Sequence, residues 1–141
     1  MASNISSILS SMKTVAIVGL SRDHSKSSHE VAHYLREKQI EVIPVNPTAD
    51  EIMELRSYPS LSAIPDEIKN RIDVVDIFRK PEDVPPIVDE AIALKKFSKK
   101  RIAVWMQLGI VNEEAAEKAR AAGLEVVMDT CISIEHRKRH S

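Results

Sequence analysis

Five short runs of mostly apolar, β-branched residues recur along this chain of 141 residues and constrain its fold more than any other feature. They occupy 14–18, 40–45, 73–78, 102–105 and 124–128. Segments with the spacing or the caps of helices separate most of them, at 28–38, 82–97 and 112–122. Buried parallel strands have continuous apolar runs, and strands that alternate with helices form βαβ units. The alternation therefore predicts a parallel sheet flanked by helices.

The expected architecture is α/β, with a Rossmann-like, doubly wound sheet of about five parallel strands and helices on both faces. Right-handed crossovers suggest the strand order 3-2-1-4-5, counted along the chain. We expect a single domain over 1–141, with a short helix within 1–11 and a mobile basic tail at 132–141. The segment 50–72 predicts irregular structure with one or two helical turns.

Glycine is scarce, since the chain has only Gly19, Gly109 and Gly123. Nucleotide-binding loops such as GxGxxG and the Walker motif need clustered glycines, so this spacing excludes both. Gly123 follows a helical segment that Asn112 caps, and we expect it to end that helix in the left-handed conformation. Gly19 and Gly109 follow the first and fourth predicted strands, where the backbone turns tightly or approaches a ligand.

Charge and cysteine content exclude further classes of protein. Twenty basic and 21 acidic residues give a net charge of −1, without the positive field that nucleic-acid binding needs. The single cysteine, Cys131, allows no intrachain disulfide and no cysteine cluster for zinc or iron–sulfur. The apolar run at 15–20 is too short to span a membrane, and no secretory signal precedes it. We therefore expect a cytoplasmic protein that binds neither nucleic acid nor membrane.

A ligand site is expected at the carboxyl ends of the strands, at the switch point of the strand order. With the expected order, this crevice lies between the first and fourth strands and is lined by 19–21 and 105–109. Residues 46–47 and 78–80 would form its side walls. The loop 19–28 leads into a helix N-terminus, whose free N–H groups and dipole attract phosphate.

A dinucleotide is not the ligand that these residues favour. In NAD-binding folds an Asp or Glu ends the second strand and binds the ribose hydroxyls. This chain has Asn46 followed by Pro47 at that place. The absent acid and the absent glycine cluster leave a NAD-binding regulator only as an alternative hypothesis.

Residues 29–33 match the HExxH pattern of zinc proteases. At about 100° per residue, His29 and His33 share one helix face, and the apolar side around Val31 lies roughly opposite. If the apolar side packs on the sheet, both histidines face water. Zinc would need a third ligand, for which His24 is a speculative candidate, and His136 and His140 lie in a tail of unknown path. We interpret the pattern as a chance match and expect no metal site.

No grouping of residues has the spacing of a catalytic triad or of an acid–base pair. Asp73 and Asp76 belong to one predicted strand, with side chains on opposite faces. Asp129, just after the fifth strand, is typical of a turn, and Cys131 of a small, partly buried side chain. Cys131 could instead place a thiol beside the reactive end of a ligand.

Seven segments carry a resemblance to a known family: VAIVGLS at 15–21, KSSHEVAHYL at 26–35, VIPVNP at 42–47, YPSL at 58–61, VDIFR at 75–79, VWMQLGIVNEEA at 104–115 and AGLEVVMDTC at 122–131. From about Ile8 to Glu135, the chain resembles small single-domain CoA-binding proteins. It is similar also to the CoA-binding domain of succinyl-CoA synthetase α-subunits and of NDP-forming acyl-CoA synthetases. The family often has glycine where this chain has Gln39, and commonly where Glu54 or Leu55 falls.

The resemblance implies a non-catalytic binding, carrier or sensor module for coenzyme A or an acyl-CoA. It gives no support for ligase activity, because the chain carries no counterpart of the domain with the phosphorylated histidine. The implied contacts are Gly19, Leu20 and Ser21 near the pyrophosphate, Lys26 and Ser28 at the phosphates, Asn46 and Pro47 beside the nucleotide, Phe78 and Arg79 at the adenosine end, and Gln107 and Gly109 along the pantetheine arm.

Two alternatives to a binding module stay open at this point. One is an enzyme that acts on a CoA thioester, with Cys131 and Asp129 near the reactive end. The other is a redox-linked thiol, in which Cys131 forms a mixed disulfide with CoA. An exposed face of the helix at 82–97 could in addition support a homodimer.

Overall fold

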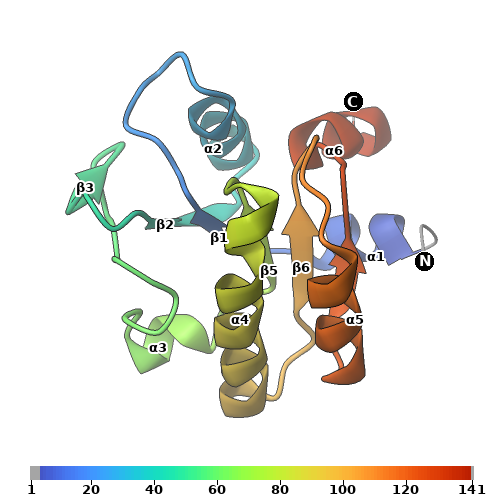
Figure 1. Cartoon of the computed structure of the whole chain (residues 1–141). Coiled ribbons are helices and arrows are strands. Elements are labelled where there is room, and N and C mark those ends of the chain that lie inside the picture. Colours follow the sequence, from blue (N-terminus) through green and yellow to red (C-terminus); the bar gives the residue numbers. More distant parts are fainter. Residues whose placement is uncertain (1–3, 141) are drawn as a thin grey trace.

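The central element is a sheet of five parallel strands in the order β2-β1-β5-β6-β7 (Figure 1). The computed structural model describes residues 4–140. The strands are β1 (Thr14–Val18), β2 (Glu41–Val45), β5 (Val74–Ile77), β6 (Ala103–Met106) and β7 (Glu125–Val127). Each lies within or beside a predicted apolar run, and the predicted Rossmann-like α/β fold is confirmed.

The predicted strand order 3-2-1-4-5 is wrong, since the observed order along the sheet is 2-1-3-4-5 in the same count. The third strand, β5, lies in the centre, where Val75 pairs with Ala16 of β1 and with Val104 of β6. All four residues of β5 are completely buried. Both orders have right-handed crossovers and buried strands, so local sequence does not distinguish them. The switch point therefore moves to the junction of β1 and β5.

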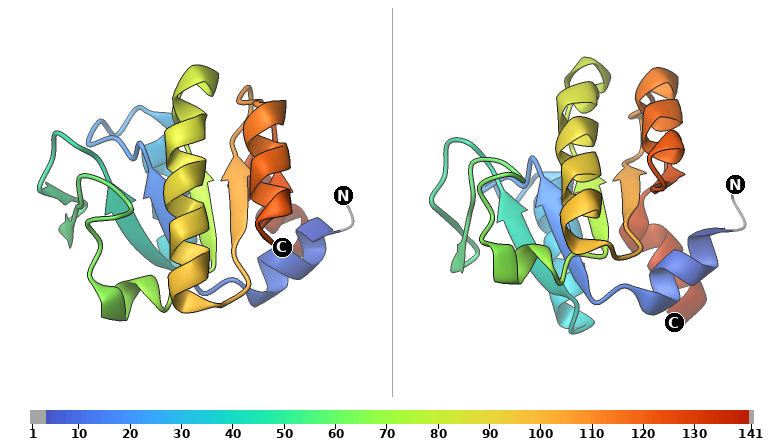
Figure 2. Two further views of the ribbon diagram at one scale, coloured as in Figure 1. Left: turned by 60° about the horizontal axis from the view of Figure 1, so that its bottom comes forward. Right: turned by 90° about the horizontal axis from the view of Figure 1, so that it is seen from below.

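Helices cover both faces of the sheet, as Figure 2 shows. They are α1 (Asn4–Ser11), α2 (Ser27–Glu37), α3 (Asp66–Lys69), a 3-10 turn (Pro81–Asp83), α4 (Val84–Ser98), α5 (Glu113–Ala121) and α6 (Ile132–His140). One apolar layer lies beneath α4 and α5, and the other lies beneath α1, α2 and α6. In the described part of the chain, no helix is both long and apolar enough to cross a membrane.

The predicted ends of α5 are confirmed. The Asn112 side chain accepts a hydrogen bond from the Ala115 N–H at 3.0 Å, as an N-cap does. Gly123 follows the helix with φ of +92° and turns the chain into β7. The predicted helix at 4–11 is also present as α1, whereas residues 1–3 lie outside the described residues.

The expectation of a mobile tail is wrong for 132–140, because this segment forms α6, whose first two turns pack against the rest of the protein. Ile132, Ser133 and His136 are buried. The Tyr34 hydroxyl lies 2.7 Å from Nδ1 of His136, which joins α2 to α6. The basic composition of the segment concealed this packing, since only one side of the helix needs to be buried. Ser141 lies outside the described residues.

The segment 50–72 is more regular than expected, since it contains a two-stranded hairpin before α3. The hairpin consists of β3 (Glu51–Ile52) and β4 (Leu55–Arg56). Its turn places Met53 and Glu54 at positive φ, and Gln39 ends α2 at φ of 64°. Glycine adopts this conformation without steric cost, so the side chains of Gln39, Met53 and Glu54 strain the backbone at these turns.

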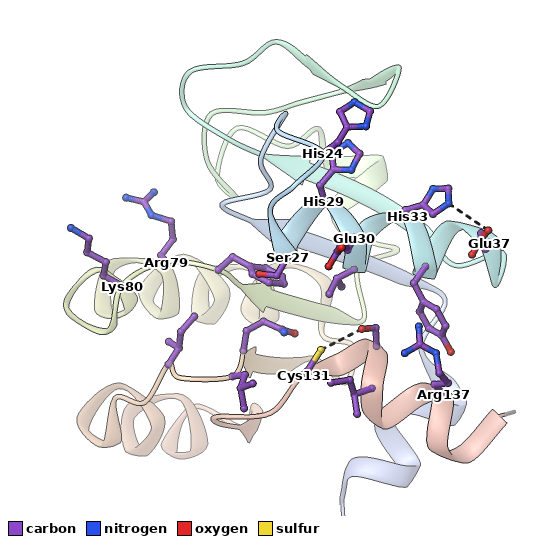
Figure 3. Close-up of a pocket in the computed structure, with 18 residues that line it drawn as sticks. His24, Ser27, His29, Glu30, His33, Glu37, Arg79, Lys80, Cys131 and Arg137 are labelled. Carbon is purple, nitrogen blue, oxygen red and sulfur yellow. Dashed lines mark hydrogen bonds and ion pairs between the residues drawn. The ribbon is translucent and has the colours of Figure 1, made fainter.

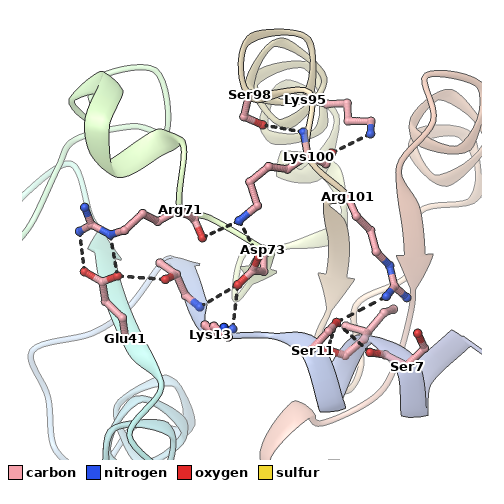
Figure 4. A network of polar contacts seen from close by, with 12 residues as sticks. Ser7, Ser11, Lys13, Glu41, Arg71, Asp73, Lys95, Ser98, Lys100 and Arg101 are labelled. Carbon is pink, nitrogen blue, oxygen red and sulfur yellow. Dashed lines mark hydrogen bonds and ion pairs between the residues drawn. The ribbon is translucent and has the colours of Figure 1, made fainter.

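The amino ends of the strands are joined by a polar network around Asp73 (Figure 4). Its carboxylate accepts hydrogen bonds from the backbone N–H of Lys13 at 2.7 Å and of Thr14 at 3.0 Å. The Lys100 ammonium lies 2.7 Å from the same carboxylate. This cluster joins the starts of β1, β5 and β6, at the edge of the sheet opposite to the carboxyl ends.

Replacing Asp73 with alanine is expected to lower the free energy of unfolding by about 1.5–3 kcal/mol, because it removes hydrogen bonds to a charged group. Urea unfolding followed by circular dichroism measures this loss. The matched control is Asp89→Ala, which removes an exposed ion pair with Lys118 and should change stability by less than about 1 kcal/mol. Equal losses in both variants would contradict the structural role of Asp73.

Candidate functional site

A cavity of about 1090 Å³ opens between α2 and α6, above the carboxyl ends of β5 and β6 (Figure 3). Four segments line it: residues 24–37, residues 78–80, residues 107–110 and residues 131–137. Side chains of the first segment face those of the last across the opening, and Arg79 and Lys80 lie at one end. Its volume lies just above the range of about 300–1,000 Å³ that is typical of small-molecule sites.

The junction of β1 and β5 is built by Gly19. Its N–H donates to the Val45 carbonyl at 2.9 Å, and the Phe78 N–H donates to the Val18 carbonyl at 2.8 Å. A Cβ atom at Gly19 would lie 2.6 Å from the Phe78 carbonyl oxygen, so only glycine fits this approach. The expectation of a crevice between the first and fourth strands is therefore corrected, because β5 intervenes between them.

The residues predicted to bind the ligand fall into two groups. Phe78, Arg79 and Gln107 line the cavity. The others lie outside its lining: Gly19, Leu20, Ser21, Lys26, Ser28, Asn46, Pro47 and Gly109. Most of this second group belongs to the loops after β1 and β2, which approach the start of α2.

The loop after β1 is held by hydrogen bonds within the protein. The Ser28 hydroxyl oxygen accepts a hydrogen bond from the Ser21 N–H at 3.0 Å. The Asn46 amide donates to the Leu20 carbonyl at 2.9 Å, and the Leu20 side chain is completely buried. Leu20, Ser28 and Asn46 therefore shape the loop, whereas Lys26 is exposed at the N-cap of α2.

The loops after β6 and β7 contact each other through Asp129. Its carboxylate accepts a hydrogen bond from the Gly109 N–H at 2.6 Å, and its own φ is +53°. This geometry is that of a turn residue, as the sequence suggested. Trp105 belongs to the core rather than to the crevice, since it is completely buried and its indole N–H donates to the Thr130 carbonyl at 2.7 Å.

The two histidines of the HExxH pattern have different surroundings. His33 is exposed and lies 3.4 Å from Glu37. The expectation that His29 also faces water is wrong, because it is buried against the His24 ring, with ring centroids 4.3 Å apart. Burial, followed by the nearby His24 and His33, lowers the pKa of His29. Among the residues that the structure describes, no group of three His, Cys, Asp or Glu side chains could hold a metal ion.

Cys131 lies in the middle of the cavity, immediately before α6. Its sulfur is 3.3 Å from the Ser133 hydroxyl. Burial opposes ionisation, but hydrogen bonds from the Ser133 hydroxyl, the Ile134 N–H and the Gln107 side chain outweigh it and lower the pKa of the thiol. The side-chain amide oxygen of Gln107 also accepts a hydrogen bond from the Ile132 N–H at 3.1 Å, which fixes this side chain at the start of α6.

Asp76 is a buried carboxyl group that sequence reasoning missed as part of this site. It is completely buried, and neither carboxylate oxygen has a hydrogen-bond partner within residues 4–140. Burial, reinforced by the negative charge of a Cys131 thiolate, raises the pKa of Asp76 well above its usual range. The available signal was an acidic residue in the middle of an otherwise apolar strand, DVVDIF. Strongly perturbed carboxyls of this kind are common at functional sites.

Comparison with known proteins identifies relatives of this chain. The profile of a family described as "CoA binding domain" matches residues 13–137. The uncharacterized protein YneT of Bacillus subtilis (strain 168) is 36% identical over 132 residues, which cover 94% of this chain and 91% of YneT. An ADP-forming acetate–CoA ligase II of Archaeoglobus fulgidus is 39% identical over 72 residues, but these cover 50% of this chain and only 11% of the ligase.

Solved structures share the whole fold. A hypothetical protein from Pyrococcus horikoshii OT3 superimposes with a TM-score of 0.86 at 36% identity, covering 98% of this chain and 91% of that protein. A protein from Thermus thermophilus, cell-free ID.343, superimposes with a TM-score of 0.84 at 31% identity and covers 98% of each chain. The likeness therefore includes the loops around the cavity as well as the sheet.

Proposed function

The chain belongs to the CoA binding domain family, and we propose that it binds coenzyme A or an acyl-CoA in the cavity between α2 and α6. The observation that carries this proposal is the position of the cavity at the carboxyl ends of the central strands, beside the switch point of β1 and β5. Ligands of open α/β sheets bind at this place. The cavity is also large enough for an extended cofactor.

The charges of the cavity suggest an orientation for the ligand. Arg79 and Lys80 lie at one end, and Figure 3 shows them well separated from Cys131. Arginine and lysine bind phosphate strongly, so the phosphates of CoA would lie at this end. The pantetheine arm would then extend past Gln107 and Leu108, which brings the sulfur end toward Cys131.

The loop after β1 supports the same orientation. Gly19 lets the backbone of β1 approach Phe78 of β5, which lines the cavity. We propose that the N–H groups of this loop, with Ser21 and Lys26, contact the pyrophosphate near the start of α2. Leu20, Ser28 and Asn46 would act indirectly, by holding the loop in its conformation. Pro47 and Gly109 would border the nucleotide and the pantetheine arm.

Isothermal titration calorimetry with CoA tests the proposal. Arg79→Ala is expected to weaken CoA binding about tenfold or more, because a hydrogen bond to a charged group contributes about 1.5–3 kcal/mol. Among residues 4–140, the guanidinium of Arg79 has Asp83 as its one polar partner, at 3.4 Å, and the side chain is about 40% exposed, so its loss should leave the fold intact. Arg120→Ala, at an exposed position of α5, is the matched control and should bind as the unmodified protein does.

Competition with NAD in the same titration separates the two nucleotide classes. Excess NAD should not displace CoA, since no acidic residue follows β2 to bind the ribose hydroxyls. Absence of any heat or thermal shift at millimolar CoA would refute the proposed function. Displacement of CoA by equimolar NAD would favour the NAD-binding alternative instead.

A further inference from the structure

The cavity contains a nucleophile placed at a helix N-terminus. The Cys131 carbonyl accepts the Glu135 N–H at 3.1 Å, so Cys131 is the capping residue of α6, which spans nine residues. The Ser133 hydroxyl lies 3.3 Å from its sulfur, and although burial opposes ionisation, hydrogen bonding at this helix start lowers the pKa of the thiol. Helix N-termini favour thiolate over thiol, and the thiolate is the reactive form of cysteine.

A second observation, independent of the helix, is the orphaned carboxyl of Asp76. In the sheet Asp76 is in register with Trp105 and Ile17, so all three side chains point to the face that α2 and α6 cover. Cys131 packs against the same apolar layer and is the titratable group that acts on Asp76. A completely buried carboxyl without a partner is costly, and its position beneath a thiol in a cavity points to chemistry there.

The third observation is an apolar rim of the cavity that also contains Cys131. Leu108 is 68% exposed and Ile134 is 44% exposed, and both line the cavity together with Ile110. Ile134 follows Cys131 by three residues on the first turn of α6. Exposed large apolar side chains that are gathered at a cavity mark a place for an apolar ligand group.

We propose that Cys131 accepts the acyl group of a CoA thioester bound in this cavity, which makes the protein an acyl carrier through its own cysteine. This step rests on the proposed function. The Cys131 sulfur attacks the thioester carbonyl carbon, a new carbon–sulfur bond forms, and the bond to the CoA sulfur breaks. The cysteine proton passes to the departing CoA thiolate, so the products are S-acyl-Cys131 and free CoA. One thioester replaces another, and no oxidant or reductant is needed.

The surrounding groups fit this transfer. The N–H groups of Ser133 and Ile134 lie beside the sulfur, where the negative oxygen of the tetrahedral intermediate develops. The apolar rim of Leu108, Ile110 and Ile134 would receive the acyl chain. Asp76 acts as a positioning residue through Cys131. When the carboxyl beneath the sulfur keeps its proton, the thiol is the one of the two acids that carries the negative charge.

Intact-protein mass spectrometry after incubation with acetyl-CoA or butyryl-CoA tests the transfer. We expect a single acyl adduct on Cys131 that hydroxylamine removes, as it removes thioesters. Acylation should be at least about tenfold faster than in the same protein unfolded in urea, because binding holds the thioester carbonyl carbon next to the Cys131 sulfur. Cys131→Ser should give no hydroxylamine-labile adduct. Calorimetry with CoA on the unmodified protein runs in parallel.

A further variant separates the electrostatic role of Asp76 from a structural one. Asp76→Asn removes the neighbouring carboxyl, so the ionisation of the Cys131 thiol is no longer coupled to that of a second acid. The pH profile of Cys131 alkylation by iodoacetamide is therefore expected to sharpen into one titration step. The other titratable groups that line the cavity are unchanged in this variant: His24, His29, Glu30, His33, Tyr34, Glu37, Arg79, Lys80 and Arg137. An alkylation profile identical to that of the unmodified protein would refute the role of Asp76.

The outcomes distinguish this inference from the proposed function. CoA binding without acylation, or acylation no faster than in the unfolded chain, overturns the transfer to Cys131 and leaves CoA binding intact. Absence of CoA binding overturns the proposed function, and the transfer with it. Acylation that persists in Cys131→Ser with the same hydroxylamine sensitivity also overturns the assignment to Cys131.

Discussion

Gly19→Ala is expected to destabilise the protein by about 3 kcal/mol or more. Two costs add at this position. The backbone has φ of +92°, and a left-handed backbone costs an L-residue roughly 1–2 kcal/mol. The new Cβ would also lie 2.6 Å from the Phe78 carbonyl oxygen and 2.9 Å from Cδ of Arg79. The carbonyl belongs to the backbone after β5 and cannot rotate away, so overpacking adds about 1–3 kcal/mol.

Gly109→Ala is the matched control, because it separates the two costs. Gly109 has φ of +84°, but a Cβ there meets no atom within 4 Å. This variant should lose only the roughly 1–2 kcal/mol of backbone strain. Urea unfolding of both variants, followed by circular dichroism, gives the comparison. Equal losses would show that the contact between β1 and β5 does not require glycine, and would contradict our account of the switch point.

Asp76→Asn is expected to stabilise the protein at neutral and alkaline pH, because it replaces a buried ionisable carboxyl with a side chain that cannot ionise. Burial, and then the Cys131 thiolate, raises the pKa of Asp76 in the folded protein above its value in the unfolded chain. Below a pH of about 4, both states are protonated and the carboxyl causes no penalty. As the pH rises, the unfolded chain ionises and the folded protein does not, so stability falls until the raised pKa is passed.

The asparagine variant lacks this loss of stability. Its advantage over the unmodified protein should be smallest near pH 4 and should grow to about 2 kcal/mol or more at pH 8. Thermal unfolding between pH 4 and pH 8 measures the difference, which corresponds to several degrees in the melting temperature. Asp89→Asn, at an exposed position of α4, is the control and should show no such trend. A stability difference that is constant across this pH range would show that Asp76 is ionised in the folded protein.

Much of the fold was predictable from local sequence, for reasons visible in particular segments. Each of the five strands lies in or beside an apolar run, since strands buried on both faces of a parallel sheet consist mostly of apolar residues. Helix ends were predictable where a single residue determines them, as Asn112 and Gly123 do for α5. The tail at 132–141 was mispredicted because α6 buries few side chains and its composition is basic.

The candidate site was predictable in part. Phe78, Arg79 and Gln107 line the cavity because each follows directly after a central strand, which local patterns locate well. The contribution of α6 was not predictable, since it depends on the return of the chain across the sheet after β7. The surroundings of Asp76 were also inaccessible, because which groups lie above a strand depends on helices distant in sequence.

The sequence by itself determined the class of fold, the exclusion of glycine-rich nucleotide loops and the strand ends beside which the cavity opens. These properties follow from the conformational preferences and burial of neighbouring residues. Only the tertiary structure decided the position of β5 between β1 and β6, the packing of α6 and the proximity of Cys131 to Asp76. These depend on contacts between segments more than 50 residues apart in the chain, such as Asp76 and Cys131, and no local preference encodes them.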